Sequence, residues 1–108
     1  MRILFDQATP GPLRPYLAGH TVRTGAEEGW DRLRNGDLLT AAENAGFDLL
    51  LTTDRNIQYQ QNIAGRKISV LILSRQQWPQ LRPHVQLVVD AVNAARPGSF
   101  TEVEIPAP

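Results

Sequence analysis

The chain has 108 residues, no cysteine and a formal net charge of zero, with 11 basic and 11 acidic side chains. This length is sufficient for one domain and too short for two. The lack of cysteine excludes disulfides, thiolate zinc sites and cysteine nucleophiles, and zero net charge argues against a protein that coats nucleic acid electrostatically. The start MRILFDQ does not resemble a signal peptide, and no apolar run approaches the roughly 20 residues that span a bilayer. We therefore expect a cytoplasmic protein without membrane contact.

Short apolar runs and helical segments are expected to alternate along the chain. In chain order we expect a strand at 3–5, a helix at 10–18, a strand at 21–23, a helix at 37–45, a strand at 49–51, a helix at 56–64, a strand at 70–73, a helix from 79 and a strand at 101–105. Continuous apolar runs are typical of parallel strands buried on both faces. The strands at 21–23 and 101–105 alternate between apolar and polar residues, which indicates sheet edges.

A glycine follows three of the expected helices, at Gly19, Gly46 and Gly65, and each is followed by a strand. Glycine at this place ends a helix in the left-handed conformation at little cost. The succession of strand, helix, glycine and strand is typical of βαβ units. We therefore predict a three-layer α/β/α sandwich with a mainly parallel sheet. It forms a single domain over residues 1–105, followed by a loose tail at 106–108.

Carboxylates follow two of the three buried strands. Asp6 comes directly after the first strand, and Asp54 comes after the apolar run at 49–51 and two threonines. In an open parallel sheet, binding sites form outside the carboxyl ends of the strands. Asp37, in the first turn of a helix, either stabilises the helix dipole or projects toward Asp6 and Asp54. The alternative interpretation is that the strand-end acids cap helices or form turns.

Clustered carboxylates repel one another unless a cation joins them. Mg²⁺ and Mn²⁺ prefer oxygen ligands and bind through a few carboxylates, so we expect either ion at Asp6, Asp37 and Asp54. Three polar residues close to Asp54 are expected to contact substrate, to orient the carboxylates or to cap the following helix. They are Thr52, Thr53 and Asn56. Arg55 is expected to hold a substrate phosphate if it lies at the same edge of the sheet.

Four short motifs occur in an order and spacing that resemble a known family. They are LFDQ at 4–7, GHTV at 19–22, NGDLL at 35–39 and TTDRN at 52–56. Together, over roughly residues 1–75, the chain resembles the PIN-like domains of the DUF5615 group, relatives of the toxin ribonucleases of bacterial toxin–antitoxin pairs. The resemblance implies an α/β/α sandwich with a Mg²⁺- or Mn²⁺-dependent site that cuts RNA. Asp6 and Asp54 match the family's strand-end acids, and Asp37 falls on or near the acid of its middle helix.

The leading hypothesis is therefore a metal-dependent endoribonuclease, the toxin component of a toxin–antitoxin pair. Its expected partners are an RNA substrate, a cognate antitoxin and a second copy of the chain. Two departures favour an alternative. Gln7 and Asn35 stand where many relatives carry acids, and fewer carboxylates weaken metal binding. The alternative is a catalytically weakened or inactive PIN-like module that binds RNA or a protein.

A third hypothesis is a receiver-like phosphoacceptor domain, in which Asp54 would accept the phosphoryl group. Such domains use a lysine at a later strand end. Lys67, the single lysine of this chain, precedes the strand at 70–73 and so lies at its wrong end. This position disfavours the third hypothesis.

The chain has two tryptophans, Trp30 and Trp78. An exposed tryptophan can stack on a nucleobase. Trp78 precedes Pro79 at a helix start, which favours a hydrophobic staple. Trp30 follows Glu27 and Glu28, whose charges would repel RNA. A core or interface role is therefore expected for Trp30.

Overall fold

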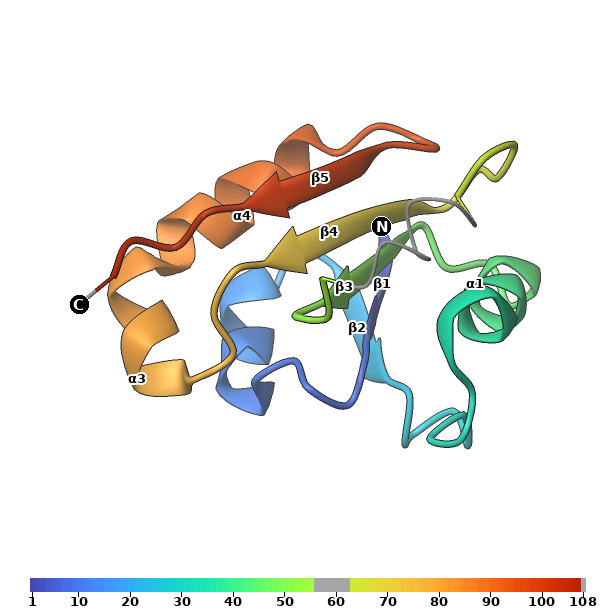
Figure 1. Cartoon of the computed structure of the whole chain (residues 1–108), viewed down its shortest axis with the longest axis horizontal. Helices are drawn as coiled ribbons and strands as arrows, with labels where there is room; N and C mark the ends of the chain where they lie inside the picture. Colours follow the sequence, from blue (N-terminus) through green and yellow to red (C-terminus); the bar gives the residue numbers. More distant parts are fainter. Residues whose placement is uncertain (56–62, 108) are drawn as a thin grey trace.

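A computed structural model describes residues 1–55 and 63–107 (Figure 1). The elements in chain order are β1 (Arg2–Phe5), η1 (Gly11–Leu17), β2 (Thr21–Thr24), α1 (Asn35–Asn44), β3 (Leu49–Thr52), β4 (Ser69–Leu73), α3 (Trp78–Leu81), η2 (Arg82–His84), α4 (Val85–Ala94) and β5 (Phe100–Val103). Most of the helix expected at 56–64, including Asn56, lies outside the described residues. Every strand predicted from the sequence is present, with boundaries that differ by one or two residues.

The five strands form one sheet in the order β2-β1-β3-β4-β5. All four neighbouring pairs are parallel, with Ile3 opposite Leu49 in the pair of β1 and β3. The two strands that alternate in sequence, β2 and β5, lie at the edges, as predicted. A parallel α/β domain is therefore confirmed.

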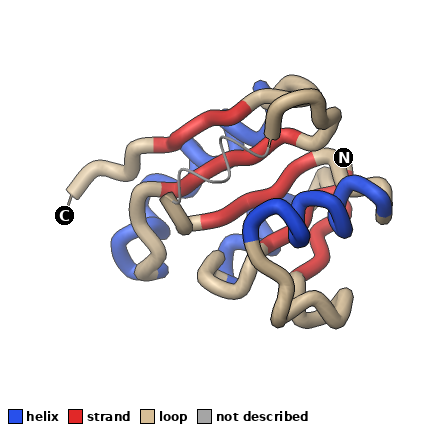
Figure 2. Tube along the Cα trace, turned by 45° about the vertical axis from the view of Figure 1, so that its right-hand side comes forward, coloured by secondary structure: helices blue, strands red, loops and turns tan. Residues whose placement is uncertain are grey.

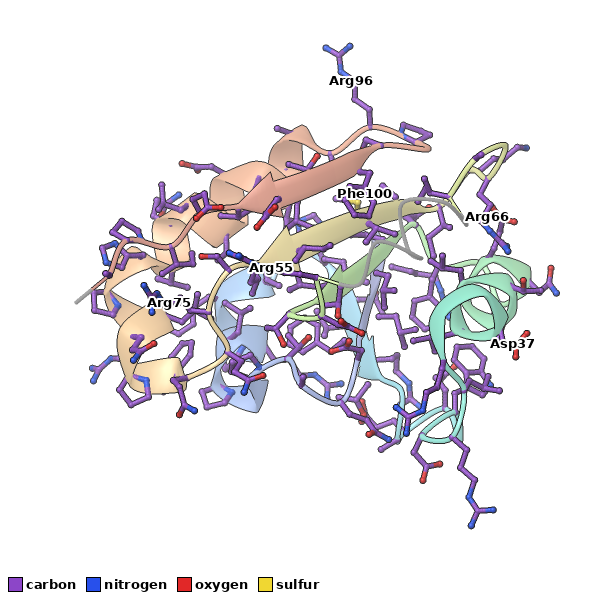
Figure 3. All side chains as sticks on the ribbon, viewed as in Figure 1. Asp37, Arg55, Arg66, Arg75, Arg96 and Phe100 are labelled. Atoms are coloured by element: carbon purple, nitrogen blue, oxygen red, sulfur yellow. The ribbon has the colours of Figure 1, made fainter. Side chains whose placement is uncertain are left out.

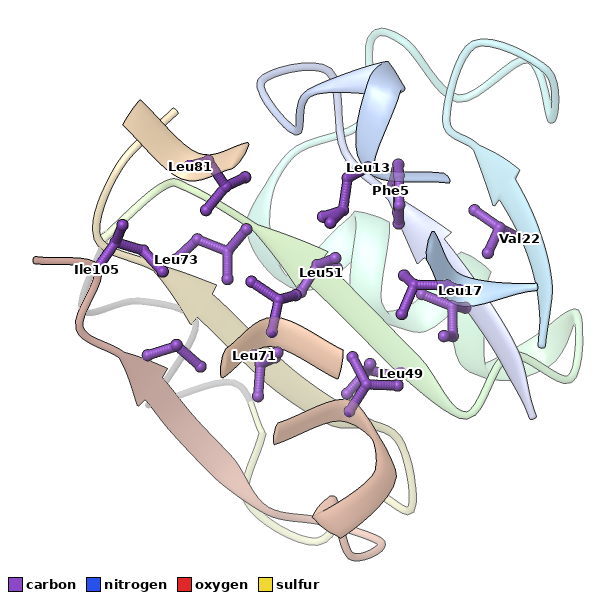
Figure 4. Packing of buried hydrophobic residues seen from close by; sticks show 14 residues of the cluster. Phe5, Leu13, Leu17, Val22, Leu49, Leu51, Leu71, Leu73, Leu81 and Ile105 are labelled. Atoms are coloured by element: carbon purple, nitrogen blue, oxygen red, sulfur yellow. The ribbon is translucent and has the colours of Figure 1, made fainter. Parts of the chain in front are cut away.

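Helices cover both faces of the sheet. Figure 2 shows α1 in front of the strands and the other helices behind them. Successive residues of a strand point to opposite faces, and the core follows this rule: Leu49 and Leu51 belong to one hydrophobic cluster, whereas Leu50 belongs to the other. Figure 4 shows the first cluster, which packs beneath η1, α3 and α4. Burial on both faces explains why the central strands are apolar without interruption.

Prolines change the helices that the sequence predicts. The first helix is a 3-10 helix with Pro15 inside it, and the last is divided into α3, η2 and α4 around Pro83. Proline lacks the N–H that an α-helix needs and clashes with the preceding turn.

The glycines predicted to end helices differ in conformation. Gly46 and Gly65 adopt positive φ angles of 84° and 76°, as predicted, but Gly19 does not. The 3-10 helix before Gly19 ends at Ala18 in a right-handed conformation.

No helix among residues 1–55 and 63–107 is long and apolar enough to cross a membrane.

Candidate functional site

A cleft lies at the carboxyl end of the sheet, beside β1 and β3. Here β2 lies on one side of β1, and the remaining strands extend on the other. In doubly wound sheets this switch point is where ligands bind, because the connecting segments diverge there. The cleft has a volume of about 710 Å³. Its lining includes Asp6, Thr53 and Asp54 at the strand ends and Trp30, Leu33 and Arg34 in the segment before α1.

Asp6 is held in place by three hydrogen bonds. Its Oδ1 accepts from Ala8 N at 3.1 Å and from Thr9 Oγ1 at 2.9 Å. Its Oδ2 accepts from the hydroxyl of Thr52. The contact with the second following N–H is typical of an aspartate turn. The carboxylate is therefore oriented before any ligand arrives.

Thr52 connects the two strand-end acids. Its hydroxyl donates to Asp6 and accepts from Asp54 N, with an N–O distance of 3.0 Å. Because β1 pairs with β3, one side chain at the end of β3 reaches both positions. Thr52 is fully buried and is not part of the cleft lining. Of the roles expected for Thr52, orientation of Asp6 agrees with this geometry, whereas contact with substrate does not.

The electrostatic environment of Asp6 opposes its ionisation. Burial raises the pKa of Asp6 above its ordinary value of 3.8, and the negative charge of Asp54 adds to this increase. The hydrogen bonds from Thr52, Thr9 and Ala8 lower the pKa but do not cancel the effect of burial. A cation bound by Asp6 and Asp54 would relieve both their repulsion and the cost of burying the charge of Asp6.

Thr53 adds an oxygen without a partner. Its Oγ1 is buried and makes no hydrogen bond with the described residues, and Thr53 lines the cleft. An unsatisfied buried hydroxyl costs about 1–3 kcal/mol. Thr53 thus combines a place in the cleft lining with a buried hydroxyl that no described residue satisfies.

Asp37 is not brought to the cleft. It is exposed in the first turn of α1 and is not part of the cleft lining. Figure 3 shows its carboxylate on the outer side of α1, pointing away from the sheet. Over residues 1–55 and 63–107, no group of three or more acidic or histidine side chains is close enough to hold a metal ion. The site therefore has two strand-end carboxylates, where three were expected.

Arg55 lines the cleft, but its guanidinium also faces β5. It forms ion pairs with Glu102 at 3.1 Å and with Glu104 at 3.7 Å, and Figure 3 shows it beside the carboxyl ends of the strands. All three side chains are substantially exposed, so these pairs contribute little to stability. A substrate phosphate would have to compete with two carboxylates for Arg55.

We find no match for this chain among protein-family models, curated proteins or solved structures.

Several cleft residues were not identified from the sequence. Gln7 Nε2 donates to the backbone oxygen of Asp31 at 2.5 Å, which ties the end of β1 to the loop before α1. Gln76 and Arg34 also line the cleft. Gln76 follows β4. Because ligands bind outside the carboxyl ends of parallel strands, its position in the sequence could have identified it as a cleft residue. No feature of the sequence marked Arg34.

The geometry also bears on the phosphoacceptor hypothesis. The strand order agrees with that of receiver-like domains. Lys67, however, lies before β4, at the amino end of the sheet, where its backbone N–H donates to Glu43. The lysine is thus at the opposite end of the strands from Asp54, as the sequence indicated.

Proposed function

We propose that this protein is a PIN-like, Mg²⁺- or Mn²⁺-dependent endoribonuclease whose active site is the cleft at Asp6 and Asp54. One observation carries the proposal. Two acidic residues follow neighbouring parallel strands at the switch point of the sheet, and the Thr52 hydroxyl connects the carboxylate of Asp6 to the backbone N–H of Asp54. An acid whose pKa is raised by burial and by a neighbouring carboxylate, as that of Asp6 is, is typical of functional sites when it lies in a cleft.

The donors in the cleft fit a hard divalent cation. Carboxylate and hydroxyl oxygens are the ligands that Mg²⁺ and Mn²⁺ prefer, and Mg²⁺ commonly binds through one or two carboxylates together with substrate phosphates. Asp6 and Asp54 would hold the ion. Thr53, which also lines the cleft, carries a buried Oγ1 that makes no hydrogen bond with the described residues. When bound, such an ion polarises a phosphodiester and lowers the pKa of water.

The remaining residues have roles that follow from their contacts. Thr52 and Thr9 hold the Asp6 carboxylate in one orientation through their hydroxyls. Gln7 fixes the loop that forms the opposite wall. Arg34 lines the cleft as an exposed cation, which suits a contact with an RNA phosphate. In this proposal the strand-end acids bind the metal, and the wall that carries Arg34 binds the RNA.

The alternative function is a non-catalytic module that binds RNA or a protein in the same cleft. Two observations favour it. Asp37 points away from the cleft, and Gln7 uses its amide as a donor to a backbone oxygen, a bond that an ionised acid could not make. Both reduce the negative charge available to a cation.

A Mn²⁺ titration by calorimetry separates the two functions. The intact protein is compared with Asp6→Asn and Asp54→Asn, and Asp37→Asn serves as the matched control because Asp37 lies outside the cleft. We expect binding to be lost in the first two variants and retained in the control. Mg²⁺-dependent cleavage of single-stranded RNA should show the same pattern, with circular dichroism to check folding.

The result that contradicts the nuclease proposal is an intact protein that binds no Mn²⁺ at millimolar concentration. The non-catalytic module would then be the better account. The assignment as a toxin, with an antitoxin and a second copy of the chain as partners, stays a prediction. Co-expression with the product of an adjacent gene, followed by size-exclusion chromatography, tests it directly.

A further inference from the structure

The wall of the cleft that faces the strand-end acids is apolar and aromatic. Trp30, Leu33 and Leu38 line it, and all three belong to or pack against the core cluster on the α1 face of the sheet. Trp30 packs edge-to-face against Phe47, with ring centroids 6.0 Å apart and an interplanar angle of 74°. A partly buried indole that is supported by the core and open to a cleft is suited to stack on a flat ligand.

The loop that carries Trp30 is fixed at several points. Trp30 N donates to Gly25 O at 2.8 Å, and Gly25 N donates to Phe5 O at 2.9 Å. The Gln7 amide holds the next residue of the loop, through the oxygen of Asp31 at 2.5 Å. A preorganised aromatic side chain loses little conformational entropy when a ligand stacks on it.

The charges around Trp30 are compatible with a nucleic acid. Glu27 and Glu28, which argued against RNA at this loop, are paired with Arg14 at 3.0 Å and with Arg23 at 2.8 Å. Arg34, on the same wall, forms no ion pair with the described residues. The charges of Glu27 and Glu28 are thus offset, and Arg34 is a cation available to a phosphate on a wall that also carries Asp31.

We propose that Trp30 is a base-stacking platform and that Arg34 contacts an adjacent phosphate, so that the cleft selects single-stranded RNA with an unstacked base beside the strand-end acids. This inference rests on the proposed function for the identity of the ligand. Bases within a duplex are already stacked and cannot lie on an indole without being flipped out. The cleft volume of about 710 Å³ lies within the range of small-ligand sites, about 300–1,000 Å³.

The two tryptophans provide a matched experiment. Trp78 belongs to the cluster on the other face of the sheet and pairs with Tyr16 at 5.8 Å, so it should not sense the cleft. Trp78→Phe leaves Trp30 as the fluorescent reporter, and Trp30→Phe leaves Trp78. Each protein is titrated with a single-stranded RNA of about six nucleotides, within the site sizes of single-strand binders, in EDTA and again with Mg²⁺.

We expect the RNA to quench Trp30 and not Trp78, and the same strand annealed to its complement to quench neither. Replacing Trp30 by Ala should weaken binding about 5- to 150-fold, which corresponds to about 1–3 kcal/mol for one stacked base. Arg34→Gln should weaken binding and reduce its salt dependence. The quenching assay keeps Trp30 in place, so it does not depend on the folding of the Ala variant.

Absence of Trp30 quenching, or equal quenching of both tryptophans, would overturn the inference. Its failure is distinguishable from that of the nuclease proposal. RNA cleavage without Trp30 quenching refutes the stacking platform and leaves the nuclease. Quenching of Trp30 without metal binding or cleavage supports the platform and identifies the protein as a non-catalytic RNA-binding module.

Discussion

Replacement of Thr52 by Val tests how the two strand-end acids are joined. The Thr52 side chain is fully buried, and Val has nearly the same shape but no hydroxyl. The substitution removes the hydrogen bond to Asp6 and leaves Asp54 N without its partner. A hydrogen bond to a charged group contributes about 1.5–3 kcal/mol. Asp54 is exposed, so water can replace the lost partner of its N–H at little cost.

We therefore expect Thr52→Val to lower the free energy of unfolding by about 2 kcal/mol at neutral pH. For a domain of this size the melting temperature should fall by about 9 °C, since the entropy of unfolding is about 2.1 cal/mol/K per residue. The pKa of Asp6 should rise further, because the hydrogen bond from Thr52 lowers it. Mn²⁺ affinity should fall, because the Asp6 carboxylate loses a hydrogen bond that holds it in one orientation.

The pH dependence of the effect has a definite sign. A hydrogen bond that lowers the folded-state pKa of an acid contributes stability at high pH, and this contribution is lost as the pH falls through that pKa. The destabilisation by Thr52→Val should therefore shrink at about pH 4 as Asp6, whose pKa is raised above 3.8, becomes protonated. Urea unfolding followed by circular dichroism at both pH values measures it.

Thr52→Ser is the control, because it keeps the hydroxyl and removes a methyl group. It should lose about 1 kcal/mol at both pH values, from packing alone. A Thr52→Val protein within about 0.5 kcal/mol of the intact protein at neutral pH would refute the reasoning. A loss in the free energy of unfolding that is equal at the two pH values would also refute it.

Three further predictions test the charge, the backbone and the core. Because burial raises the pKa of Asp6, the intact protein should lose stability as the pH rises through that pKa, and Asp6→Asn should remove this loss; urea midpoints across this range check the sign. Gly98 has a φ of 74°, and a Cβ there would lie 3.0 Å from Arg66 O. Gly98→Ala should therefore lower thermal stability by about 1–3 kcal/mol, whereas Gly19→Ala, with open space around it, should be neutral or stabilising in the same scan. Leu71 is 1% exposed, so Leu71→Ala should cost about 2–5 kcal/mol in chemical unfolding, and a loss below about 1 kcal/mol would contradict its place in the core.

The central strands could be predicted from the sequence because their signal is local. Continuous apolar runs at Ile3–Phe5, Leu49–Leu51 and Val70–Leu73 need helices on both faces of the sheet, and the structure has both layers. The strand-end positions of Asp6 and Asp54 follow directly, since a residue after a parallel strand lies at the carboxyl edge of the sheet. Helix type was less predictable, because proline effects depend on position within a turn.

Which strand ends are neighbours was decided by the tertiary structure. The sequence places Asp6 and Asp54 at one edge, but only the pairing of β1 with β3 allows Thr52 to contact both. Similarly, the rotation of α1 about its axis directs Asp37 outward, and that rotation is determined by the packing of Leu38 and Leu39 into the core.

The opposite wall of the cleft depends even more on long-range contacts. In the sequence, Gln7 stands where many members of the resembled family carry an acid. In the fold, its amide donates to the backbone oxygen of Asp31 and so holds that loop. The charges of Glu27 and Glu28 are offset by arginines, one of which lies 13 residues away in the chain. Local sequence determines which side chains are present and which face of a strand they occupy. Only the folded chain determines their distances, and those distances set the charge, orientation and accessibility of the site.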